Sequence, residues 1–504
     1  FSDPNRAWET WKEIFLEIAN KHALLRQKRV KSEYCRWMTN EIKKQSYHRD
    51  YLKKKAISLN SANYFQAYKR CKNQLNKCIK QTKSTYYNLK LANSNNSKES
   101  WQTINELLNR KSKTTKINQI LINDKPIVGD EEIANKFNEY FSEIGKKLAE
   151  EIPDNDFDPL HYVTPVLNSF TFQTISEEDV HRIISSMKTS KSAGTDKISV
   201  KLIQAAGKTI LNTLKNIFNL SLNTGIFPDD WKIARVTPIF KSDNKTDCGN
   251  YRPISIISNV AQIFEKAVYS QLITFLNENK VIVENQSGFR TNHSTETTLL
   301  HSITNYLANM DKGLINGVVF IDFKKAFDTV DHTILLAKLE RCGIRETPLK
   351  WFRSYLHQRK QVCKINNAVS NAAHINCGVP QGSNLGPLLF NLYINDLPNC
   401  LQTTSASMFA DDTNLSCKGK TSADIEYKLN CDLANIQKWL ISNKLTLNRT
   451  KTEYMLIGSQ QRLDKIIKTP TILFGEHEIK RVREKTVLGL IIDEQLKWNK
   501  HNNE

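Results

Sequence analysis

The stretch Gly317-Val-Val-Phe-Ile-Asp322-Phe-Lys-Lys-Ala-Phe327-Asp328 is the clearest guide to the fold of this chain. Val318 to Ile321 form an uninterrupted apolar run, which predicts a buried strand that ends at Asp322. A helix is expected to follow and to end just before Gly343. A carboxylate at the end of a buried strand is costly unless it contacts a positive group, so Asp322 either binds a cation or caps the helix.

A second acidic segment follows in Ser407-Met-Phe-Ala-Asp411-Asp412-Thr-Asn-Leu-Ser, which alternates like a strand around a tight turn. Adjacent carboxylates repel each other unless cations neutralise them. An exposed Asp-Asp turn is the alternative, but the apolar flanks make simple exposure less favourable. If both strand ends converge with Asp322, their oxygen atoms suit hard divalent ions. Two such ions, ~3.5–4 Å apart, would stabilise the attacking and leaving oxygens at phosphorus.

Charge points to a polyanionic partner. The 504 residues carry 72 Lys and Arg against 52 Asp and Glu, a formal net charge of +20. From Lys21 to Lys90 there are 19 basic and three acidic residues, which gives this block alone +16. Aromatic residues such as Tyr51 and Phe65 are interleaved with the basic ones. The combination favours nucleic-acid binding over a merely solvated basic surface.

Several classes of protein are excluded by composition. No window approaches the ~20 uncharged apolar residues of a membrane span, and the N-terminal FSDPNRAWET lacks a signal-peptide pattern. The ten cysteines form no CxxC pair and no Cys/His zinc spacing, so we expect reduced, mainly buried thiols and no structural zinc. These features predict an intracellular protein, in the nucleus and/or the cytoplasm, with no membrane partner.

The pattern along the chain suggests two regions. Residues 1–115 are predicted to be helical, 119–128 to form a hairpin with its turn at Asn123-Asp124, and 130–151 to form an amphipathic helix. We therefore expect a basic helical N-terminal extension or connector over 1–165. A mixed region of strands and helices is expected over 166–504, with a core at about 222–493.

From about Ser190 to His501 the chain resembles the reverse transcriptases of non-LTR retrotransposons, closest to jockey-like elements. Motifs of that family occur in the family's order. They are Pro238-Ile-Phe-Lys241, Asn250-Tyr-Arg252-Pro-Ile-Ser, Phe320-Ile-Asp322-Phe-Lys-Lys-Ala-Phe327-Asp328, Gly378-Val-Pro-Gln381-Gly382, Phe409-Ala-Asp411-Asp412, Leu445-Thr-Leu-Asn448-Arg-Thr-Lys451-Thr-Glu and Val487-Leu-Gly489-Leu-Ile-Ile-Asp.

The resemblance implies an α+β, right-hand polymerase with palm and fingers, whose palm is a ferredoxin-like sheet with helices. It implies RNA-directed DNA polymerase activity with an RNA template, a DNA primer, dNTPs and two Mg²⁺ ions, for which Mn²⁺ is a possible substitute. No endonuclease motif of this family precedes the polymerase motifs, and the sequence ends soon after the primer-grip resemblance. We therefore expect a fragment with a truncated thumb.

The resemblance implies that the acidic residues bind the metal ions. Asp322 and Asp411 are expected to be the main magnesium ligands, Asp412 a supporting one, and the Phe323 carbonyl a further one. Lys451 is expected either to protonate the leaving pyrophosphate or to serve as a structural or phosphate-contacting residue.

The resemblance implies that residues of the predicted fingers and of the palm motifs bind the nucleotide. Lys241 and Arg252 are expected to bind the triphosphate. Phe327 is expected to lie beneath the incoming sugar and exclude a 2′-hydroxyl, although its position alone would suit ordinary core packing. Gln381 is expected to contact nucleotide or template, and Gly382 to permit close backbone approach.

Two acidic residues next to the palm motif are not expected to bind metal. Asp328 and Asp331 are instead expected to support the helix that follows. Two other functions remain open from the sequence: a catalytically inactive nucleic-acid-binding remnant of such an element, and a polymerase that uses rNTPs.

Overall fold

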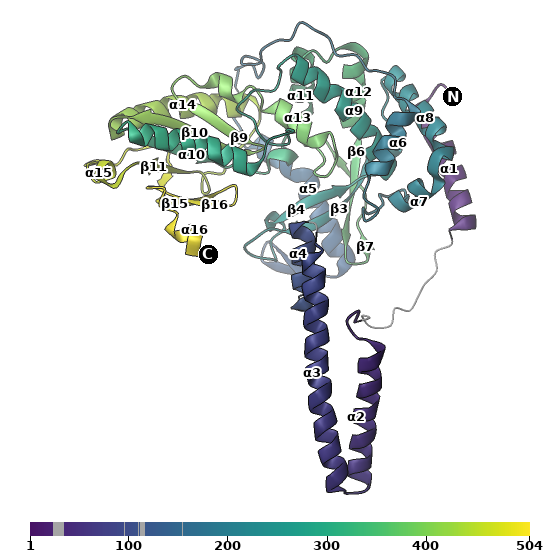
Figure 1. Cartoon of the computed structure of the whole chain (residues 1–504). Coiled ribbons are helices and arrows are strands. Elements are labelled where there is room, and N and C mark those ends of the chain that lie inside the picture. Colours follow the sequence, from purple (N-terminus) through teal and green to yellow (C-terminus); the bar gives the residue numbers. More distant parts are fainter. Residues whose placement is uncertain (24–34, 95, 109, 111–115, 154, 504) are drawn as a thin grey trace. The chain divides into compact units, whose positions relative to one another are not determined.

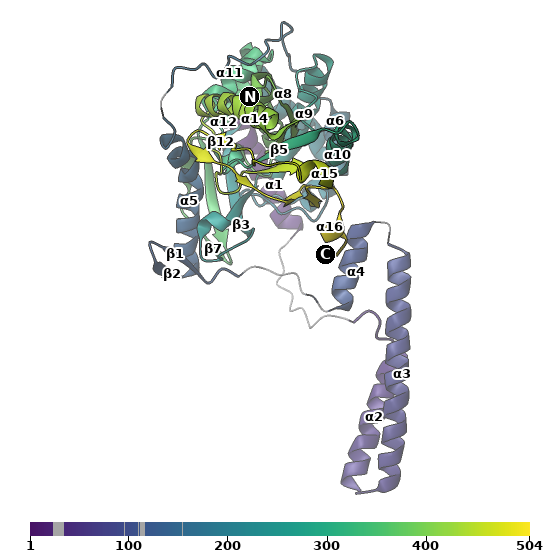
Figure 2. The same cartoon turned by 90° about the vertical axis from the view of Figure 1, so that its left-hand side faces the viewer.

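The computed structural model of the chain describes residues 1–23, 35–94, 96–108, 110, 116–153 and 155–503. It divides into two compact units. The first comprises Phe1–Ala23 together with Lys116–Glu504, and the second comprises Leu24–Thr115. The first unit contains two five-stranded sheets and most of the helices, whereas the second is helical (Figures 1 and 2).

The sheet that contains the predicted strand, here called the β5 sheet, has the order β14-β11-β5-β10-β9. Its strands are β5 (Ile315–Ile321), β9 (Ser405–Phe409), β10 (Asp412–Gly419), β11 (Glu453–Ile457) and β14 (Lys480–Arg481). All neighbours are antiparallel except β11 and β14, which are parallel. Every residue of β5 is buried, which confirms the strand predicted from the apolar run and extends it by three residues at its start.

Both faces of the β5 sheet are covered, which explains why β5 is apolar on both sides. One face packs into the main core with α14 (Ser422–Ser442), α13 (Gly386–Tyr393) and α11 (His332–Arg341). The other face packs against α10 (Thr295–Asp311) and the hairpin of β15 (Glu484–Val487) and β16 (Leu490–Asp493). Val319 and Ile321 belong to the first core, and Val318 and Phe320 to the second, as the period of two requires.

The second large sheet, here called the β3 sheet, has the order β4-β3-β6-β7, with β8 also paired to β6. Its strands are β3 (Ile233–Phe240), β4 (Tyr251–Ile256), β6 (Arg359–Ile365), β7 (Ala368–Val369) and β8 (Ala373–Ile375). Helix α5 (Asp130–Glu150) buries Ile133, Phe137 and Phe141 in the same core as strands of this sheet. The predicted amphipathic helix is therefore confirmed, and the β3 sheet is what its apolar face packs against.

A short hairpin precedes α5, as predicted. Strands β1 (Gln119–Ile122) and β2 (Lys125–Val128) pair in antiparallel fashion. Asn123 and Asp124 form the turn, with φ angles of 49° and 60°. Asn and Asp tolerate this left-handed backbone better than most residues, which explains why the turn forms here.

The remaining helices of the first unit pack around the two sheets or lie near the chain ends. They are α1 (Pro4–His22), α6 (Glu177–Ser186), α7 (Val200–Ala206), α8 (Leu211–Thr224), α9 (Asn259–Glu278), α12 (Glu346–Leu356), α15 (Gln460–Leu463) and α16 (Asn499–Asn503). One small hairpin, of β12 (Leu473–Phe474) and β13 (His477–Glu478), completes the strands.

The first unit begins earlier in the chain than the expected boundary at residue 166. Trp8 of α1 is fully buried, its indole Nε1 donates a hydrogen bond of 2.7 Å to Asp230, and its ring lies 5.0 Å from that of Trp231. Residues 1–23 and 116–165 thus lie in the same unit as the two sheets. The division differs from the expected one because these segments bury apolar side chains in the cores of the sheets.

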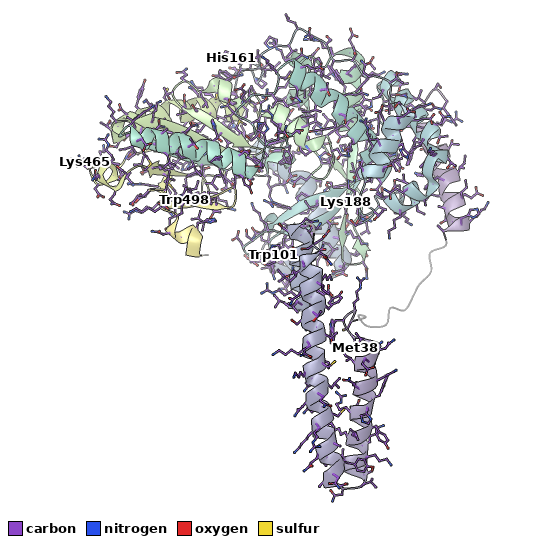
Figure 3. The ribbon with its side chains drawn as sticks, in the orientation of Figure 1. Met38, Trp101, His161, Lys188, Lys465 and Trp498 are labelled. Carbon is purple, nitrogen blue, oxygen red and sulfur yellow. The ribbon has the colours of Figure 1, made fainter. Side chains whose placement is uncertain are left out.

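The second unit consists of α2 (Asn40–Ser58), α3 (Ala62–Ala92) and α4 (Ser97–Leu107). Helices α2 and α3 lie side by side and run in opposite directions (Figures 1 and 2). Their buried residues are few, namely Ile42, Leu52, Ala56, Leu75 and Tyr87. Long side chains project outward along both helices, and Trp101 on α4 is exposed (Figure 3). The helical prediction for the basic region is confirmed for these described residues.

Two expectations about compartment can be compared with the structure. No helix in the described ranges combines enough length with enough apolar character to cross a bilayer. All ten cysteines are free thiols, and five of them are buried: Cys248, Cys342, Cys363, Cys400 and Cys417. Burial raises the pKa of the Cys363 thiol to about 12, so this thiol stays protonated at neutral pH.

Candidate active site

The structure brings the two acidic segments to one edge of the β5 sheet. Strand β10 pairs with β5 so that Thr413 lies opposite Ile321. Asp412 and Asp322 are the next residues on their strands, so they extend the same pairing by one position. Asp411 precedes Asp412 in the turn between β9 and β10. The three carboxylates, 89 residues apart in sequence, thus share one sheet edge.

The turn that carries Asp411 is a tight hairpin. Phe409 pairs with Asp412, which leaves Ala410 and Asp411 as the two loop residues. Ala410 has a φ of 56°, in the left-handed region that the primed hairpin turns require at this position. An alanine is disfavoured in this conformation because its Cβ approaches the backbone, so surrounding contacts must hold it there.

Asp322 is held by the segment that precedes β11. The Asn448 side chain donates a hydrogen bond of 2.7 Å to Asp322 Oδ2, and the Asn448 backbone N–H donates one of 2.7 Å to the Asp322 carbonyl. Phe323 forms an isolated antiparallel bridge with Leu447. Because alternate peptide groups face opposite sides of a strand, the Phe323 carbonyl faces the side on which β10 lies.

The electrostatics of the carboxylates are those of a crowded acidic site. Burial raises the pKa of Asp411, and the nearby charge of Asp322 raises it further. Partial desolvation raises the pKa of Asp412, as do the charges of Asp411 and Asp322. Lys241 and Arg252 oppose both shifts because their positive charges favour the ionised carboxylates.

The donor set fits a divalent cation chemically. Hard cations prefer oxygen ligands, and a cation would relieve the mutual repulsion of three carboxylates. Within the described residues, no group of three or more His, Cys, Asp or Glu side chains has the spacing of a metal site. The carboxylates are therefore brought to one edge by the fold, and metal ligation by Asp322, Asp411 and Asp412 stays a prediction.

A pocket of about 710 Å³ opens beside this edge. Nine of the ten predicted site residues line it: Lys241, Arg252, Asp322, Phe323, Phe327, Gln381, Gly382, Asp411 and Lys451. The tenth, Asp412, is the exposed neighbour of Asp411. Residues of α5 and β4, together with the segments that follow β3 and β5 and several other connecting segments, thus form one concave surface with carboxylates and cations on its lining.

Phe327 is part of an aromatic group on the pocket wall. Its ring stacks on Phe390 of α13 at 4.3 Å between centroids, and Phe289 meets it almost perpendicularly at 6.3 Å. Phe327 is half-buried and Phe289 is 50% exposed. The Phe327 ring therefore packs against the core and also faces the pocket. Its expected position beneath the incoming sugar stays a prediction beside the packing role.

Gln381 and Gly382 make contacts that differ from a simple ligand loop. The Gln381 Nε2 donates a hydrogen bond of 2.8 Å to Asp328 Oδ1, which leaves the Gln381 Oε1 as the atom that could accept from a ligand. Gly382 has a φ of 133°, and a Cβ built there would lie 2.3 Å from the Ser255 carbonyl oxygen. The close approach that requires glycine is thus to strand β4 rather than to a ligand.

The structure separates the roles of the two further aspartates. Asp331 caps α11 by accepting hydrogen bonds from the N–H groups of Thr333 and Ile334, as expected. The expectation for Asp328 is wrong, because its carboxylate contacts Gln381 and lines the pocket instead of supporting the helix. Burial raises the pKa of Asp328 to about 6.

Three functional candidates were missed by sequence reasoning. Lys325 donates to the carbonyls of Gly249 at 2.7 Å and Tyr251 at 3.3 Å, so it joins the end of β5 to the start of β4. Burial lowers the pKa of this lysine. The second candidate is Asn448, which contacts Asp322, and the third is Gln286, which contacts the Ala410 turn. Only the folding of the chain brings each residue to its partner. No local pattern in the sequence indicates either pairing.

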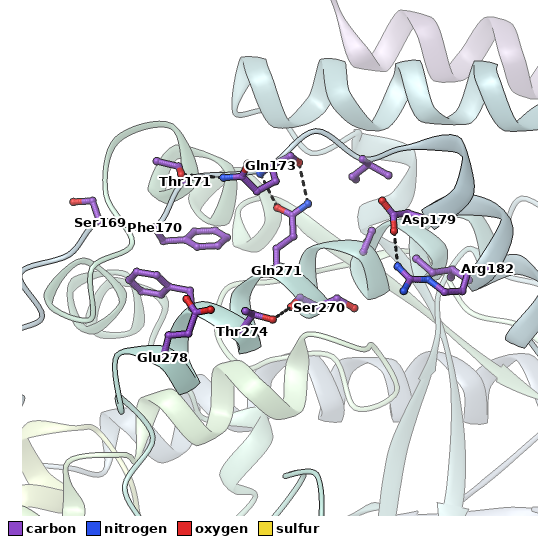
Figure 4. A pocket seen from close by; sticks show the side chains of 14 residues that line it. Ser169, Phe170, Thr171, Gln173, Asp179, Arg182, Ser270, Gln271, Thr274 and Glu278 are labelled. Atoms are coloured by element: carbon purple, nitrogen blue, oxygen red, sulfur yellow. Dashed lines mark hydrogen bonds and ion pairs between the residues drawn. The ribbon is translucent and has the colours of Figure 1, made fainter.

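A separate pocket of about 410 Å³ lies elsewhere in the first unit, between α6, α9 and the segment 169–175 (Figure 4). Gln271 of α9 accepts a hydrogen bond from the Gln173 N–H and donates one to its carbonyl, each at 2.9 Å. The lining contains none of the ten predicted site residues. This pocket is therefore distinct from the candidate site.

Comparison with known proteins agrees with the geometry. The chain is 27% identical over 347 residues to the RNA-directed DNA polymerase from mobile element jockey of Drosophila melanogaster, an alignment that covers 67% of this chain and 37% of that protein. It is 26% identical over 355 residues to the probable RNA-directed DNA polymerase from transposon BS of the same species, covering 67% and 38%.

A third relative extends over more of the chain. The putative 115 kDa protein in type-1 retrotransposable element R1DM of Drosophila melanogaster is 25% identical over 409 residues, covering 80% of this chain and 37% of that protein. The chain spans a little over a third of the length of these curated relatives.

One family model accounts for the region that contains the site. The model for reverse transcriptase (RNA-dependent DNA polymerase) matches residues 241–492, which is half of the chain. The matched span begins at Lys241 and includes all ten predicted site residues. Its N-terminal limit directly follows β3, and its C-terminal limit lies in β16. The chain therefore belongs to the reverse transcriptase family and is similar to the polymerases of non-LTR retrotransposons.

Proposed function

We propose that this chain is an RNA-directed DNA polymerase, which copies an RNA template by adding dNTPs to the 3′-hydroxyl of a DNA primer. The observation that carries the proposal is the meeting of Asp322 with Asp411 and Asp412 at one sheet edge. The adjoining pocket, lined by Lys241 and Arg252, supplies positive charge for a triphosphate. The catalytic region is proposed to be about residues 222–493.

The proposed cofactors are two Mg²⁺ ions, with Mn²⁺ as a possible substitute. Asp322 and Asp411 would hold them, with Asp412 and the Phe323 carbonyl in support. When bound, such ions supply charge neutralisation at phosphorus and a lower proton affinity for the attacking hydroxyl. Burial raises the pKa values of Asp411 and Asp412, and the neighbouring carboxylates raise them further, which supports this assignment because a bound cation would offset both effects.

The residues of the chain act mainly by binding and orientation. Asn448 restrains one oxygen of Asp322, so the other remains available to a ligand. Lys241 and Arg252 would bind the triphosphate oxygens, and Phe327 would lie beneath the sugar. Lys451, which is exposed on the pocket lining, would donate a proton to the leaving pyrophosphate. Such positioning lowers the barrier without covalent chemistry on the protein.

Primer extension tests this proposal directly. The chain is incubated with poly(rA)/oligo(dT), dTTP and either Mg²⁺, Mn²⁺ or EDTA. We expect extension with Mg²⁺, extension at a different rate with Mn²⁺, and none with EDTA. Extension that persists in EDTA, or its absence with both metals, would contradict the proposal. Replacing dTTP by UTP in the same assay distinguishes a polymerase that uses rNTPs.

A second candidate function is nucleic-acid binding by the helical unit without catalysis, as in an inactive remnant. It is favoured by the exposed basic side chains of α2 and α3, among them Lys44, Lys53, Lys69 and Lys80. Binding of a labelled RNA that weakens steeply with salt, together with no extension at high Mg²⁺ or Mn²⁺, would support it.

The cellular setting is part of the proposal as well. A ribonucleoprotein in the nucleus or cytoplasm would expose the chain to reducing conditions, and the ten free thiols agree with such conditions. Fractionation of cells that express the tagged chain, with RNase treatment of each fraction, tests both the compartment and the bound RNA.

A further inference from the structure

We propose that Gln286 is a positioning residue that holds the Ala410–Asp411 turn in place for the reaction, an inference that rests on the proposed function. Gln286 is fully buried. Its Oε1 accepts hydrogen bonds from the Ala410 N–H at 2.9 Å and the Gly288 N–H at 2.8 Å. Its Nε2 donates one of 3.3 Å to the Ala410 carbonyl. One amide side chain thus engages both backbone groups of the first turn residue.

The backbone around Gln286 is anchored to the same hairpin. The Ser287 N–H donates to the Met408 carbonyl at 2.8 Å, and the Met408 N–H donates to the Asn285 carbonyl at 2.9 Å. Residues 285–287 therefore pair with the outer edge of β9, where Gln286 and Met408 form a parallel bridge. Because its backbone is fixed to β9, the Gln286 side chain has a defined distance to span to Ala410.

The loop after Gln286 is held from two further directions. Arg290 Nη1 donates to the carbonyls of Val283 at 3.1 Å and Gln286 at 2.9 Å, which closes the loop on itself. Asn391 of α13 donates from its Nδ2 to the Gly288 carbonyl at 2.7 Å. These bonds keep Gln286 from moving with the turn. The turn is therefore anchored to the rest of the fold through Gln286.

The turn needs such a restraint for two reasons. Ala410 occupies a left-handed backbone conformation that a side chain disfavours, with a φ of 56°. Asp411 and Asp322 carry like charges, so repulsion would push the turn away from β5 before a cation binds. The Gln286 contacts oppose both tendencies, because they bind the N–H and the carbonyl of Ala410 in the observed conformation.

The backbone at residue 288 packs too closely on the Ala410 turn for any residue but glycine. A Cβ built on Gly288 would lie 2.2 Å from the Ala410 nitrogen, closer than real atoms approach. The backbone of residue 288 is therefore in direct contact with the turn, and only glycine permits it. Gln286 and Gly288 together form a bracket beside the turn that carries a carboxylate of the candidate site.

The test compares the full-length wild type with Gln286→Leu, which keeps the side-chain volume and removes all three hydrogen bonds. We expect kcat for primer extension to fall about 10- to 100-fold, because small misplacements of reacting groups cost this much, with KM for dTTP within about twofold. The matched control is Gln361→Leu, a buried glutamine on β6 whose Nε2 has no partner among the described residues. It should keep both constants.

A second readout does not depend on activity. Hydrogen–deuterium exchange of the peptide that contains Ala410 should be faster in Gln286→Leu than in the wild type and unchanged in Gln361→Leu. Faster exchange with wild-type kcat would show a structural contact only and would overturn the inference. A wild type that fails to extend primers would overturn the proposed function instead, whereas the exchange data would still report on the bracket.

Rescue distinguishes positioning from general destabilisation. Glycine adopts positive φ without strain, so Ala410→Gly added to Gln286→Leu should recover about fivefold or more of the lost kcat. No recovery would overturn the inference. If Gln286→Leu does not fold, Gln286→Asn serves in its place, because it keeps the amide but is one methylene too short to reach Ala410.

Discussion

The edge of the β5 sheet and the α2–α3 pair of the second unit both concentrate charge, but they do so in opposite ways. At the sheet edge, a few carboxylates lie within a packed fold, and Asp411 has a raised pKa caused by burial. Along α2 and α3, cations such as Lys53 and Lys54 are exposed. The first region holds its charges against an electrostatic cost, whereas the second leaves them in water.

This contrast teaches where single substitutions should matter. A buried charge is restrained by specific partners, so its energy depends on each of them. Exposed cations act on a polyanion through their sum, so each contributes a small and similar share. Changes at the sheet edge should therefore have large and specific effects, and changes along the helices small and additive ones.

The largest effect is expected at Asp411. Asp411→Asn should lower primer extension about 10³-fold, because the amide removes a charge on which the proposed cofactor depends. The thermal unfolding midpoint should not fall, since the substitution also removes like-charge repulsion. Asp124→Asn is the matched control, because it makes the same change at another hairpin turn. Undiminished dTTP incorporation by Asp411→Asn would contradict the metal assignment.

A large effect on stability is expected at Asp328. Its pKa is about 6 in the folded chain against an ordinary value of 3.8 for an aspartate, so the neutral form favours folding below pH 3.8 and this gain is lost as pH rises through 6. Asp328→Asn should therefore exceed the wild type in unfolding free energy by up to about 3 kcal/mol at pH 8, and by about half of that at pH 5. Urea unfolding at both pH values measures the difference.

Asp331 provides the control of opposite sign. Lys444 and the α11 N–H groups lower the pKa of Asp331 against the effect of burial, so its ionised form stabilises the fold above its unfolded pKa. Asp331→Asn should therefore be less stable than the wild type at pH 8. A loss of stability in Asp328→Asn at pH 8 would instead show that ionised Asp328 is adequately paired.

An intermediate effect is expected at the pocket wall. If Phe327 lies beneath the sugar, Phe327→Ala should reduce the preference for dTTP over UTP about 10-fold or more, because space opens for a 2′-hydroxyl. Competing kcat/KM measurements on the same primer give this ratio. Phe289→Ala removes the neighbouring ring and should leave the ratio within about twofold. An unchanged ratio in Phe327→Ala would favour the packing role.

The smallest effect is expected along α2. Replacing Lys53, Lys54 and Lys55 by Gln should weaken RNA binding about 3- to 10-fold and reduce the slope of log K against log salt by about 2. The triple Arg variant keeps the charge and should bind as the wild type does. If the slope does not change, these lysines make no phosphate contacts. That result would contradict the view that the exposed cations of α2 act together on a polyanion.

The sequence predicted several local elements of the fold well. The apolar run before Asp322, the Asp411–Asp412 turn and the Asn123–Asp124 hairpin all lie where their patterns indicate, because each depends on neighbours in the chain. The two compact units do not divide at the expected boundary of residue 166. Trp8 is buried against Trp231, a contact that no local pattern reveals.

Taken alone, the sequence determined which residues could carry the chemistry: an acid after a buried strand, a paired acid at a turn, and an excess of cations in one block. Only the tertiary structure decided that Asp322 is held by Asn448, that Asp328 pairs with Gln381, and that Gln286 holds the Ala410 turn. Periodicity and turn chemistry act between near neighbours, and so they are legible in the chain. Side-chain hydrogen bonds across more than 50 residues depend on how whole elements pack, and packing is a property of the folded molecule.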